Sequence, residues 1–320
     1  MSEGSKGSGL KLIEAQSLEI ISLMDNSLDI LSTIRRNEVK SVREWTKKHF
    51  RLPIAEHGFS MFIRVFYDGK VHSVLFDTGC SLNGVVTNAK RLGINLAEVE
   101  YIVLSHGHYD HFGGLIYVVK AVGKDNLPII VHEDMFKKRG VASPKGNIRE
   151  YPAFPKEEMV KPAKYIKTKQ PYLIANGLIL VTGEIPRETS FEKGYSQHKA
   201  FIDGKWQPDP WIWDDRALII NVKNKGLVII SGCAHAGIIN TALYAQRITG
   251  IKVIHALLGG FHLAGKESEQ RISQTVKEIK RIKPNLLAPS HCTGWRGSYT
   301  LAMSMPKAFV WNSVGNLYKF

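Results

Sequence analysis

The segment "YIVLSHGHYDHFGGL", residues 101–115, places three histidines and an aspartate within six positions, directly after an apolar run. The run has the composition of a short buried strand, and the glycines around the cluster allow a tight turn. His106 and His108 are one residue apart, so a turning backbone can direct both at one metal ion. Asp110 and His111 diverge from that pair and suit a second ion. Two ions about 3.5–4 Å apart can share a water molecule or a substrate oxygen.

Three other histidines also follow strongly apolar runs: His235 after "GLVIISGCA", His262 after "KVIHALLGGF" and His291 after "NLLAPS". Because the carboxyl ends of neighbouring strands meet at one edge in α/β folds, we expect these side chains to join the first cluster. We expect His235 and His291 to be metal ligands, and His262 to be a ligand, a substrate contact or a structural residue. The histidines without this context are expected to be structural or surface residues: His49, His72, His132 and His255.

The order of the predicted elements indicates the fold class. Alternating apolar residues predict hairpins over 61–79 and 214–232, and single strand–helix units separate them. This pattern predicts an α/β fold in which two sheets are packed between helices, a four-layer αββα sandwich. We expect a flexible N-terminal tail over 1–17 and one domain over 18–320. A Lys- and Pro-rich stretch near 137–170 is interpreted as an insertion loop.

The composition of the 320-residue chain limits the classes of molecule that it is expected to bind. The net charge of +14 favours anionic partners, but the basic residues are dispersed and form no recognisable nucleic-acid module. We therefore expect a small anionic substrate rather than a nucleic acid; the oligomeric state is not indicated. The chain has no apolar run long enough for a membrane span, and its start lacks the apolar core of a signal peptide. A cytoplasmic protein without disulfides is expected, since its three cysteines lie far apart.

Several of these motifs resemble those of a known family. "LSHGHYDHFGGL" resembles the H-x-H-x-D-H signature of the metallo-β-lactamase-fold superfamily, "VLFDTG" (74–79) its strand-end Asp-Thr-Gly, and "APSHCTG" its late histidine. Within that superfamily, further stretches resemble the dihydropteroate-synthase-like subgroup: "AEHGFS" (55–60), "TGEIPRETSFE" (182–192), "GCAHAGI" (232–238), "GGFHLAG" (259–265) and "SHCTG" (290–294). The resemblance spans most of the chain from about residue 18 onward.

The resemblance implies two divalent metal ions, with zinc expected and manganese, iron or magnesium as alternatives. It assigns His106 and His108 to the first ion, and Asp110, His111 and His291 to the second. The histidine that the superfamily usually has about 20 residues before the strand end is missing. We therefore favour His235 as the middle ligand, with Cys233 or Asp215 as alternatives. Asp110 and His262 are the candidate catalytic residues.

The subgroup implies a transferase that joins a pterin-methyl pyrophosphate to an aryl-amine phosphate. A metal-dependent hydrolase of a phosphoester or lactone is the alternative, followed by a nuclease of the same fold. Arg187 is a candidate phosphate clamp, because guanidinium matches phosphate oxygens bidentately. Trp213, with Trp206 and Trp211 nearby, is a candidate for stacking on a flat ring, although plain loop packing also accounts for it. A metal-binding redox protein is disfavoured, because the chain has no flavin or haem motif.

Overall fold

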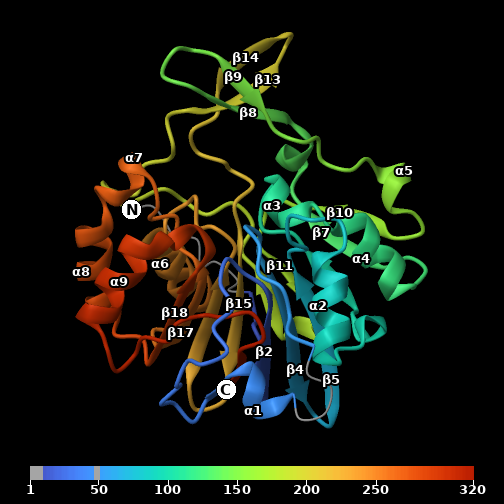
Figure 1. Cartoon of the computed structure of the whole chain (residues 1–320), viewed down its shortest axis with the longest axis vertical. Coiled ribbons are helices and arrows are strands. Elements are labelled where there is room, and N and C mark those ends of the chain that lie inside the picture. The colour runs from blue at the N-terminus through green and yellow to red at the C-terminus, as the bar shows by residue number, and fades with distance from the viewer. Residues whose placement is uncertain (1–9, 47–50) are drawn as a thin grey trace, which may run out of the picture.

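Two β-sheets lie face to face between two layers of helices in the computed structural model, which describes residues 10–46 and 51–320 (Figure 1). The first sheet has the strand order β11 (Tyr172–Ile174), β12 (Ile179–Val181), β15 (Ala217–Val222), β16 (Gly226–Ser231), β17 (Ile254–Gly260) and β18 (Leu286–Ser290), with β1 (Glu14–Ala15) also paired to β15. The second has the order β10 (Lys164–Lys167), β7 (Pro128–Val131), β6 (Tyr101–Val103), β5 (Lys70–Phe76), β4 (Ser60–Tyr67), β2 (Ser17–Met24), β19 (Leu317–Lys319) and β3 (Val39–Lys40).

The helices cover the outer faces of the two sheets (Figure 1). Beside the second sheet lie α2 (Gly84–Leu92) and α4 (Leu115–Val122); beside the first lie α6 (Ile238–Thr249), α8 (Ile272–Ile282) and α9 (Gly294–Ser304). Short helices complete the set: α1 (Val42–Trp45), α3 (Tyr109–Phe112), α5 (Glu157–Val160) and α7 (Lys266–Glu269). The helices α2 and α6 end where Gly93 and Gly250 adopt the left-handed conformation.

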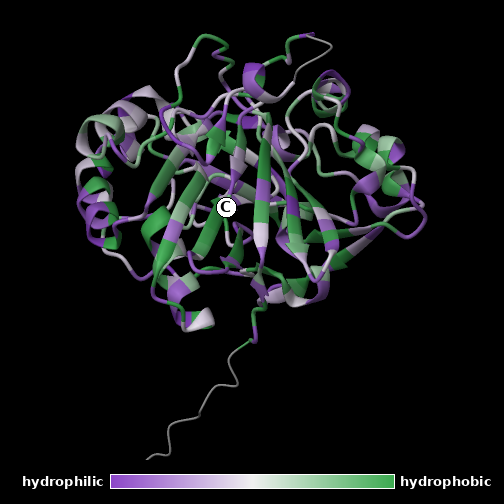
Figure 2. Ribbon diagram, turned by 90° about the horizontal axis from the view of Figure 1, so that it is seen from below, coloured by the Kyte–Doolittle hydropathy of each residue, from purple (hydrophilic) through white to green (hydrophobic). Residues whose placement is uncertain are grey.

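Successive side chains along each strand face opposite sides of its sheet, and this alternation produces the layers of the sandwich. In β16, Val228 and Ile230 face the other sheet, whereas Leu227 and Ile229 face the helices. Because successive strand side chains point to opposite faces, one apolar run can supply both the core between the sheets and a core under a helix layer. The interior strands are accordingly mostly hydrophobic in Figure 2, while the outer helices mix both colours. The predicted αββα sandwich is confirmed.

The segment near 137–170 contains more regular structure than the insertion loop that the sequence suggested. The strands β8 (Lys138–Ala142) and β9 (Ile148–Glu150) form a hairpin, and β8 pairs with β13 (His198–Ile202). With β14 (Lys205–Pro208), which pairs with β13, they make a separate four-stranded sheet at the top of Figure 1. The later strand β10 joins the edge of the second main sheet, beside β7. The prediction failed because the hairpin's partner strand lies about sixty residues further along the chain, where single-strand periodicity carries no information.

The expected tail over 1–17 is also partly ordered. Residues 1–9 lie outside the described part of the chain, as does His49. Beyond them, Leu10 and Leu12 pack against the helix-covered core, and β1 pairs with β15. Within residues 10–46 and 51–320, no helix has the length and apolar character needed to cross a membrane.

Candidate metal centre

Strand ends from both main sheets converge on one cavity. His106 follows β6, His235 follows β16, His262 follows β17 and His291 follows β18 directly. The parallel strands β16, β17 and β18 are neighbours in one sheet, so their carboxyl ends meet at one edge, as expected from the sequence. The cavity has a volume of about 380 Å³, and several of the predicted residues line it: His108, Asp110, Cys233, His235, His262 and His291.

The first cluster consists of His106, His108 and His235. One ring nitrogen of each lies within 4.8 Å of the others, and His106 Nε2 is 3.0 Å from His108 Nδ1. Burial holds the pKa of His106 and of His235 well below that of a free imidazole, and lowers the pKa of His108 to about 3. Among the described residues, His235 Nε2 and His108 Nε2 are buried without a hydrogen-bond partner. Neutral, converging imidazoles with unused nitrogens fit a metal ion.

The second cluster is centred on Asp110. Its Oδ2 lies 3.7 Å from His111 Nε2 and 3.1 Å from His291 Nε2. Burial opposes ionisation of Asp110, but His111 and His291 outweigh it and hold the pKa of the carboxyl below its usual range. Burial likewise opposes protonation of His111, but Asp77 and Asp110 raise its pKa to about 9. The surroundings therefore favour positive charge at this point, which a divalent ion would supply.

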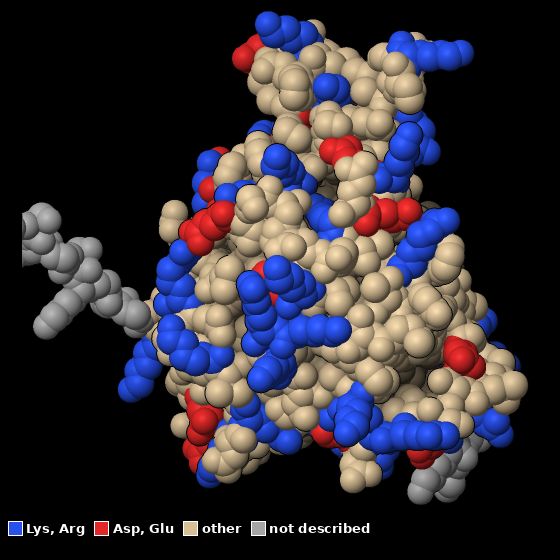
Figure 3. All heavy atoms as spheres, turned by 90° about the vertical axis from the view of Figure 1, so that its left-hand side faces the viewer, with Lys and Arg blue, Asp and Glu red and all other residues tan. Residues whose placement is uncertain are grey.

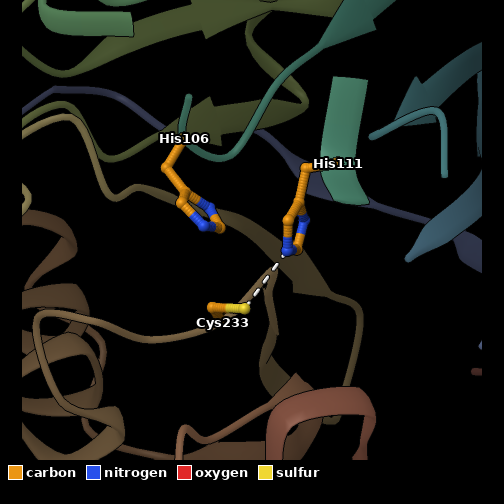
Figure 4. Close-up of side chains that lie close together, drawn as sticks. All are labelled: His106, His111 and Cys233. Atoms are coloured by element: carbon orange, nitrogen blue, oxygen red, sulfur yellow. Dashed lines mark hydrogen bonds between the residues drawn. The ribbon is translucent and has the colours of Figure 1, made fainter. Parts of the chain in front are cut away.

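A buried thiol lies between the two clusters. Cys233 Sγ is 3.1 Å from His111 Nε2, and the side chains of His106 and His111 both point toward it (Figure 4). A ligand atom of Cys233 lies within 4.8 Å of those of His106 and His111, and also of those of His235 and His262. The sequence alternative for the middle ligand thus occupies a position next to both clusters, beside His235 rather than instead of it.

Groups behind the histidines fix the direction of their rings. Asp77, the aspartate of "VLFDTG", accepts a hydrogen bond from His111 Nδ1 at 2.6 Å and one from Ser105 Oγ at 2.7 Å. Ser105 Oγ in turn lies 2.9 Å from His106 Nδ1, and Asn26 Oδ1 lies 3.0 Å from His291 Nδ1. Each of these rings is held through Nδ1, so Nε2 is left facing the cluster. Such support is typical of metal-binding histidines.

Two adjacent aspartates, Asp214 and Asp215, support the loops of the first cluster. Asp215 Oδ2 accepts a hydrogen bond from the backbone N–H of Ala236 at 2.9 Å, next to His235, and burial raises the pKa of Asp215 to about 6. Asp214 Oδ2 accepts from the backbone N–H of Gly107 at 2.8 Å. The structure places Asp215 in none of the ligand groups found among the described residues. Its Oδ1 is buried without a hydrogen-bond partner among the described residues, so the alternative role of Asp215 as the middle ligand stays a prediction, while its Oδ2 positions the loop that carries His235.

Glycines of the motif lie very close to the backbone of neighbouring segments. A Cβ atom on Gly113 would lie 1.8 Å from the carbonyl oxygen of Cys80, and one on Gly107 would lie 2.8 Å from Met135 Cα. Neither position has room for a side chain. The expected reason was a tight turn of the backbone, but Gly107, Gly113 and Gly114 all have negative φ; close packing against neighbouring backbone is what requires Gly107 and Gly113 here.

Two histidines of the site were not predicted. His57, in "AEHGFS", has its Nε2 3.5 Å from Asp110 Oδ2 and its ring 4.8 Å from that of His291. His198, the first residue of β13, has its ring 4.9 Å from that of His108. Neither follows an apolar strand, so the pattern that identified the others could not find them. The only sequence signal was the place of His57 within a motif shared with the resembled subgroup.

The structure does not place the predicted substrate contacts, Arg187 and Trp213, at the cavity. Arg187 donates hydrogen bonds to the carbonyl oxygens of Trp211 at 2.7 Å and Ile212 at 2.8 Å, and its guanidinium lies 4.5 Å from the centre of the Trp213 ring. Neither Arg187 nor Trp213 is among the described residues that line the cavity. The guanidinium already has backbone partners, so it stabilises the loop before β15.

The remaining histidines that the structure describes lie away from the cluster, as expected. His72 pairs with Glu100 and His132 with Glu184, while His255 lies within β17 with its ring 5.5 Å from that of Phe320. His262, by contrast, lines the cavity with its ring 4.2 Å from that of His235. Its Nδ1 is buried without a partner among the described residues. A ligand role and a substrate contact therefore both stay open for His262.

Comparison with known proteins agrees with this fold. The family model of the metallo-beta-lactamase superfamily matches residues 55–242, more than half of the chain. The chain therefore belongs to the metallo-beta-lactamase superfamily.

Two relatives in sequence and one solved structure are similar to the chain over most of its length. The chain is 31% identical over 273 residues to 7,8-dihydropterin-6-methyl-4-(beta-D-ribofuranosyl)-aminobenzene-5'-phosphate synthase of Methanocaldococcus jannaschii, covering 83% of this chain and 90% of the relative. It is 34% identical over 264 residues to an uncharacterized protein of the same organism, covering 82% and 93%. The crystal structure of a metal-dependent hydrolase of the beta-lactamase superfamily superimposes with a TM-score of 0.72 at 24% identity, covering 95% and 98%, which shows a shared fold. The resemblance found in the motifs is confirmed.

Proposed function

We propose that the protein is a binuclear metal-dependent transferase that joins a dihydropterin-methyl pyrophosphate to a ribofuranosyl-aminobenzene phosphate. The observation that carries the proposal is the pair of adjacent ligand clusters in one cavity, in a chain 31% identical to a synthase of this name over most of its length. A cavity of about 380 Å³ is in the range for small-molecule sites.

Each cluster would hold one ion. His106, His108 and His235 would bind the first; Asp110, His111 and His291 would bind the second, with Cys233 next to both. Zinc is the proposed metal, because imidazole, thiolate and carboxylate are its usual protein ligands. When bound, such ions supply Lewis acidity that neutralises charge on a departing pyrophosphate.

The chain's own residues would position the two substrates. Tyr109, Tyr151 and Tyr195 line the cavity and offer aromatic surface to a flat pterin or aryl ring. His262 lies in the same wall with an unused Nδ1, so we propose that it forms a hydrogen bond with bound substrate. In the transfer, the methylene–oxygen bond to pyrophosphate breaks, a bond to the aryl acceptor forms, and the acceptor loses a proton.

The test is an assay of the metal-loaded protein with both substrates. We expect pyrophosphate release that requires the aryl-amine acceptor, with formation of the joined product. Release in water without the acceptor would instead support a hydrolase. No turnover of either kind by protein that holds two metal ions would contradict the proposal.

Replacing His235 should separate a metal-binding histidine from a structural one. We expect His235→Ala to lose one bound ion or to reduce turnover by about tenfold or more, because it removes a buried nitrogen from the first cluster. The matched variant His255→Ala should keep metal and turnover and lose only stability, since His255 lies within β17. Elemental analysis and turnover of both variants check this. Unchanged metal and turnover in His235→Ala would shift the middle ligand to Cys233.

We infer that nucleic acid is not the substrate. Figure 3 shows Lys and Arg side chains scattered over one face with acidic residues between them. A nucleic-acid binder that neutralises Z phosphates loses affinity for duplex DNA with a log–log salt slope of about −0.9Z. We expect no tight, salt-sensitive binding of labelled RNA or DNA at two salt concentrations. Submicromolar binding with cleavage, and no turnover of a small phosphate, would support a nuclease.

A further inference from the structure

The cavity contains one basic side chain apart from its histidines. Among the described residues that line it, Arg149 is the only lysine or arginine, and Asp110 is the only carboxylate. Asp110 faces His111 and His291 within the second cluster, so it does not neutralise a guanidinium. The exposed side of the cavity therefore carries a positive charge with no acidic counterpart.

Arg149 is free to bind a ligand. Within residues 10–46 and 51–320, its guanidinium forms no ion pair or hydrogen bond. The acid next to it in sequence, Glu150, instead pairs with Lys138 at 2.9 Å. This contrasts with Arg187, whose guanidinium is already bonded to backbone carbonyls. An exposed guanidinium without partners presents its full set of donors to an anion.

The small sheet holds Arg149 in a defined place relative to the metal ligands. Arg149 lies in β9, opposite Val141 of β8. The same strand β8 carries Arg139, which donates two hydrogen bonds to Asp214, at 2.6 and 2.8 Å, and Asp214 accepts from Gly107 between His106 and His108. The hairpin is thus anchored by a buried ion pair to the turn that carries the first cluster.

Aromatic side chains line the cavity near the guanidinium of Arg149. Tyr151 follows β9 directly and also lines the cavity, with its ring 5.3 Å from that of His108 and 5.8 Å from that of Tyr109. Going inward from Arg149, the wall therefore changes from a guanidinium to tyrosine rings to the histidines. A ligand that fits this order has a phosphate at one end and a flat ring nearer the metal clusters.

We propose that Arg149 binds the phosphate monoester of the acceptor substrate and determines its specificity, an inference that rests on the proposed function. Guanidinium and phosphate form paired, charge-assisted hydrogen bonds, which lysine cannot reproduce with the same geometry. The pyrophosphate of the other substrate belongs instead beside the metal clusters, at the buried end of the cavity.

The test compares Arg149→Gln and Arg149→Lys with Lys145→Gln in the metal-loaded protein. Lys145 is an exposed cation on the turn of the same hairpin and does not line the cavity, so it is the matched control. Calorimetry measures binding of ribose 5-phosphate, ribose and pyrophosphate. We expect Arg149→Gln to bind ribose 5-phosphate about tenfold to a hundredfold more weakly. Arg149→Lys should be intermediate, and Lys145→Gln should resemble the wild type.

Equal metal content in all variants shows that the loss lies in anion binding. The inference is overturned if the wild type binds ribose 5-phosphate no better than ribose, or if Arg149→Gln weakens only pyrophosphate. It is also overturned if Lys145→Gln weakens ribose 5-phosphate as much as Arg149→Gln does. Failure of the proposed function is distinct: the two-substrate assay would give no product, while Arg149-dependent binding of ribose 5-phosphate remained. Product formation with an unchanged acceptor KM in Arg149→Gln would overturn this inference alone.

Discussion

Asp110→Ala should hold about one metal ion fewer per chain than the wild type and lose roughly 10³-fold or more in turnover. The carboxylate Oδ2 is the atom on which His111 and His291 converge, so its removal leaves the second cluster without its only anion. An ion that stabilises transition-state charge contributes several kilocalories per mole, and each 1.36 kcal/mol is about tenfold in rate. Elemental analysis and the two-substrate assay measure the two effects.

Two further variants test whether the effect is specific to the carboxylate of Asp110. Asp125→Ala removes an exposed carboxylate outside the cavity and should change neither metal content nor turnover. Asp110→Asn keeps the shape of the side chain without its charge, so it should also lose the second ion. If Asp110→Ala keeps two ions and wild-type turnover, the assignment of the second cluster is wrong.

The sequence predicted the parts of the site that come from strand ends. His106, His235 and His291 each follow an apolar run, and parallel neighbours in a sheet bring the carboxyl ends of such runs together. Alternation along β4, β5, β15 and β16 likewise predicted two hairpins and a sandwich. These predictions succeeded because the periodicity of a buried strand is a local property of the chain.

The features of the site that the sequence did not reveal depend on pairing between segments that are distant in the chain. Arg149 and His198 reach the cavity only because β8 pairs with β13, and nothing in either short strand specifies that partner. Arg187 was chosen for its residue type, but whether a guanidinium faces a cavity or a row of carbonyl groups depends on the loop that folds over it. Residue type predicts which chemistry a side chain can perform, while tertiary contacts decide whether it is available to perform it.

Arg139→Met should be the most destabilising single change near the site, lowering the free energy of unfolding by about 3–5 kcal/mol. The buried guanidinium donates to Asp209 at 3.0 Å and to both carboxylate oxygens of Asp214. Removing it leaves two buried carboxylates without the cation that forms hydrogen bonds with both. The matched variant Lys138→Met breaks the exposed pair with Glu150 and the cation–π contacts with Phe201 and Trp206, which together should cost about 1–2 kcal/mol. Urea denaturation of both variants measures the difference.

The pH dependence of the stability lost in Arg139→Met shows whether the charge of Arg139 is the cause. Burial opposes ionisation of Asp214, but Arg139 outweighs it and holds the pKa of Asp214 below its usual range. A depressed carboxyl pKa stabilises the fold above the unfolded-state value of about 3.9, and this stabilisation is lost as pH falls through the folded value. In Arg139→Met, the buried carboxylates should instead take up protons at higher pH than in the unfolded chain. The stability difference between the wild type and Arg139→Met should therefore shrink as pH falls from 7 toward 4. A difference that stayed constant over this range would mean that Arg139 contributes through packing of its side chain and not through its charge.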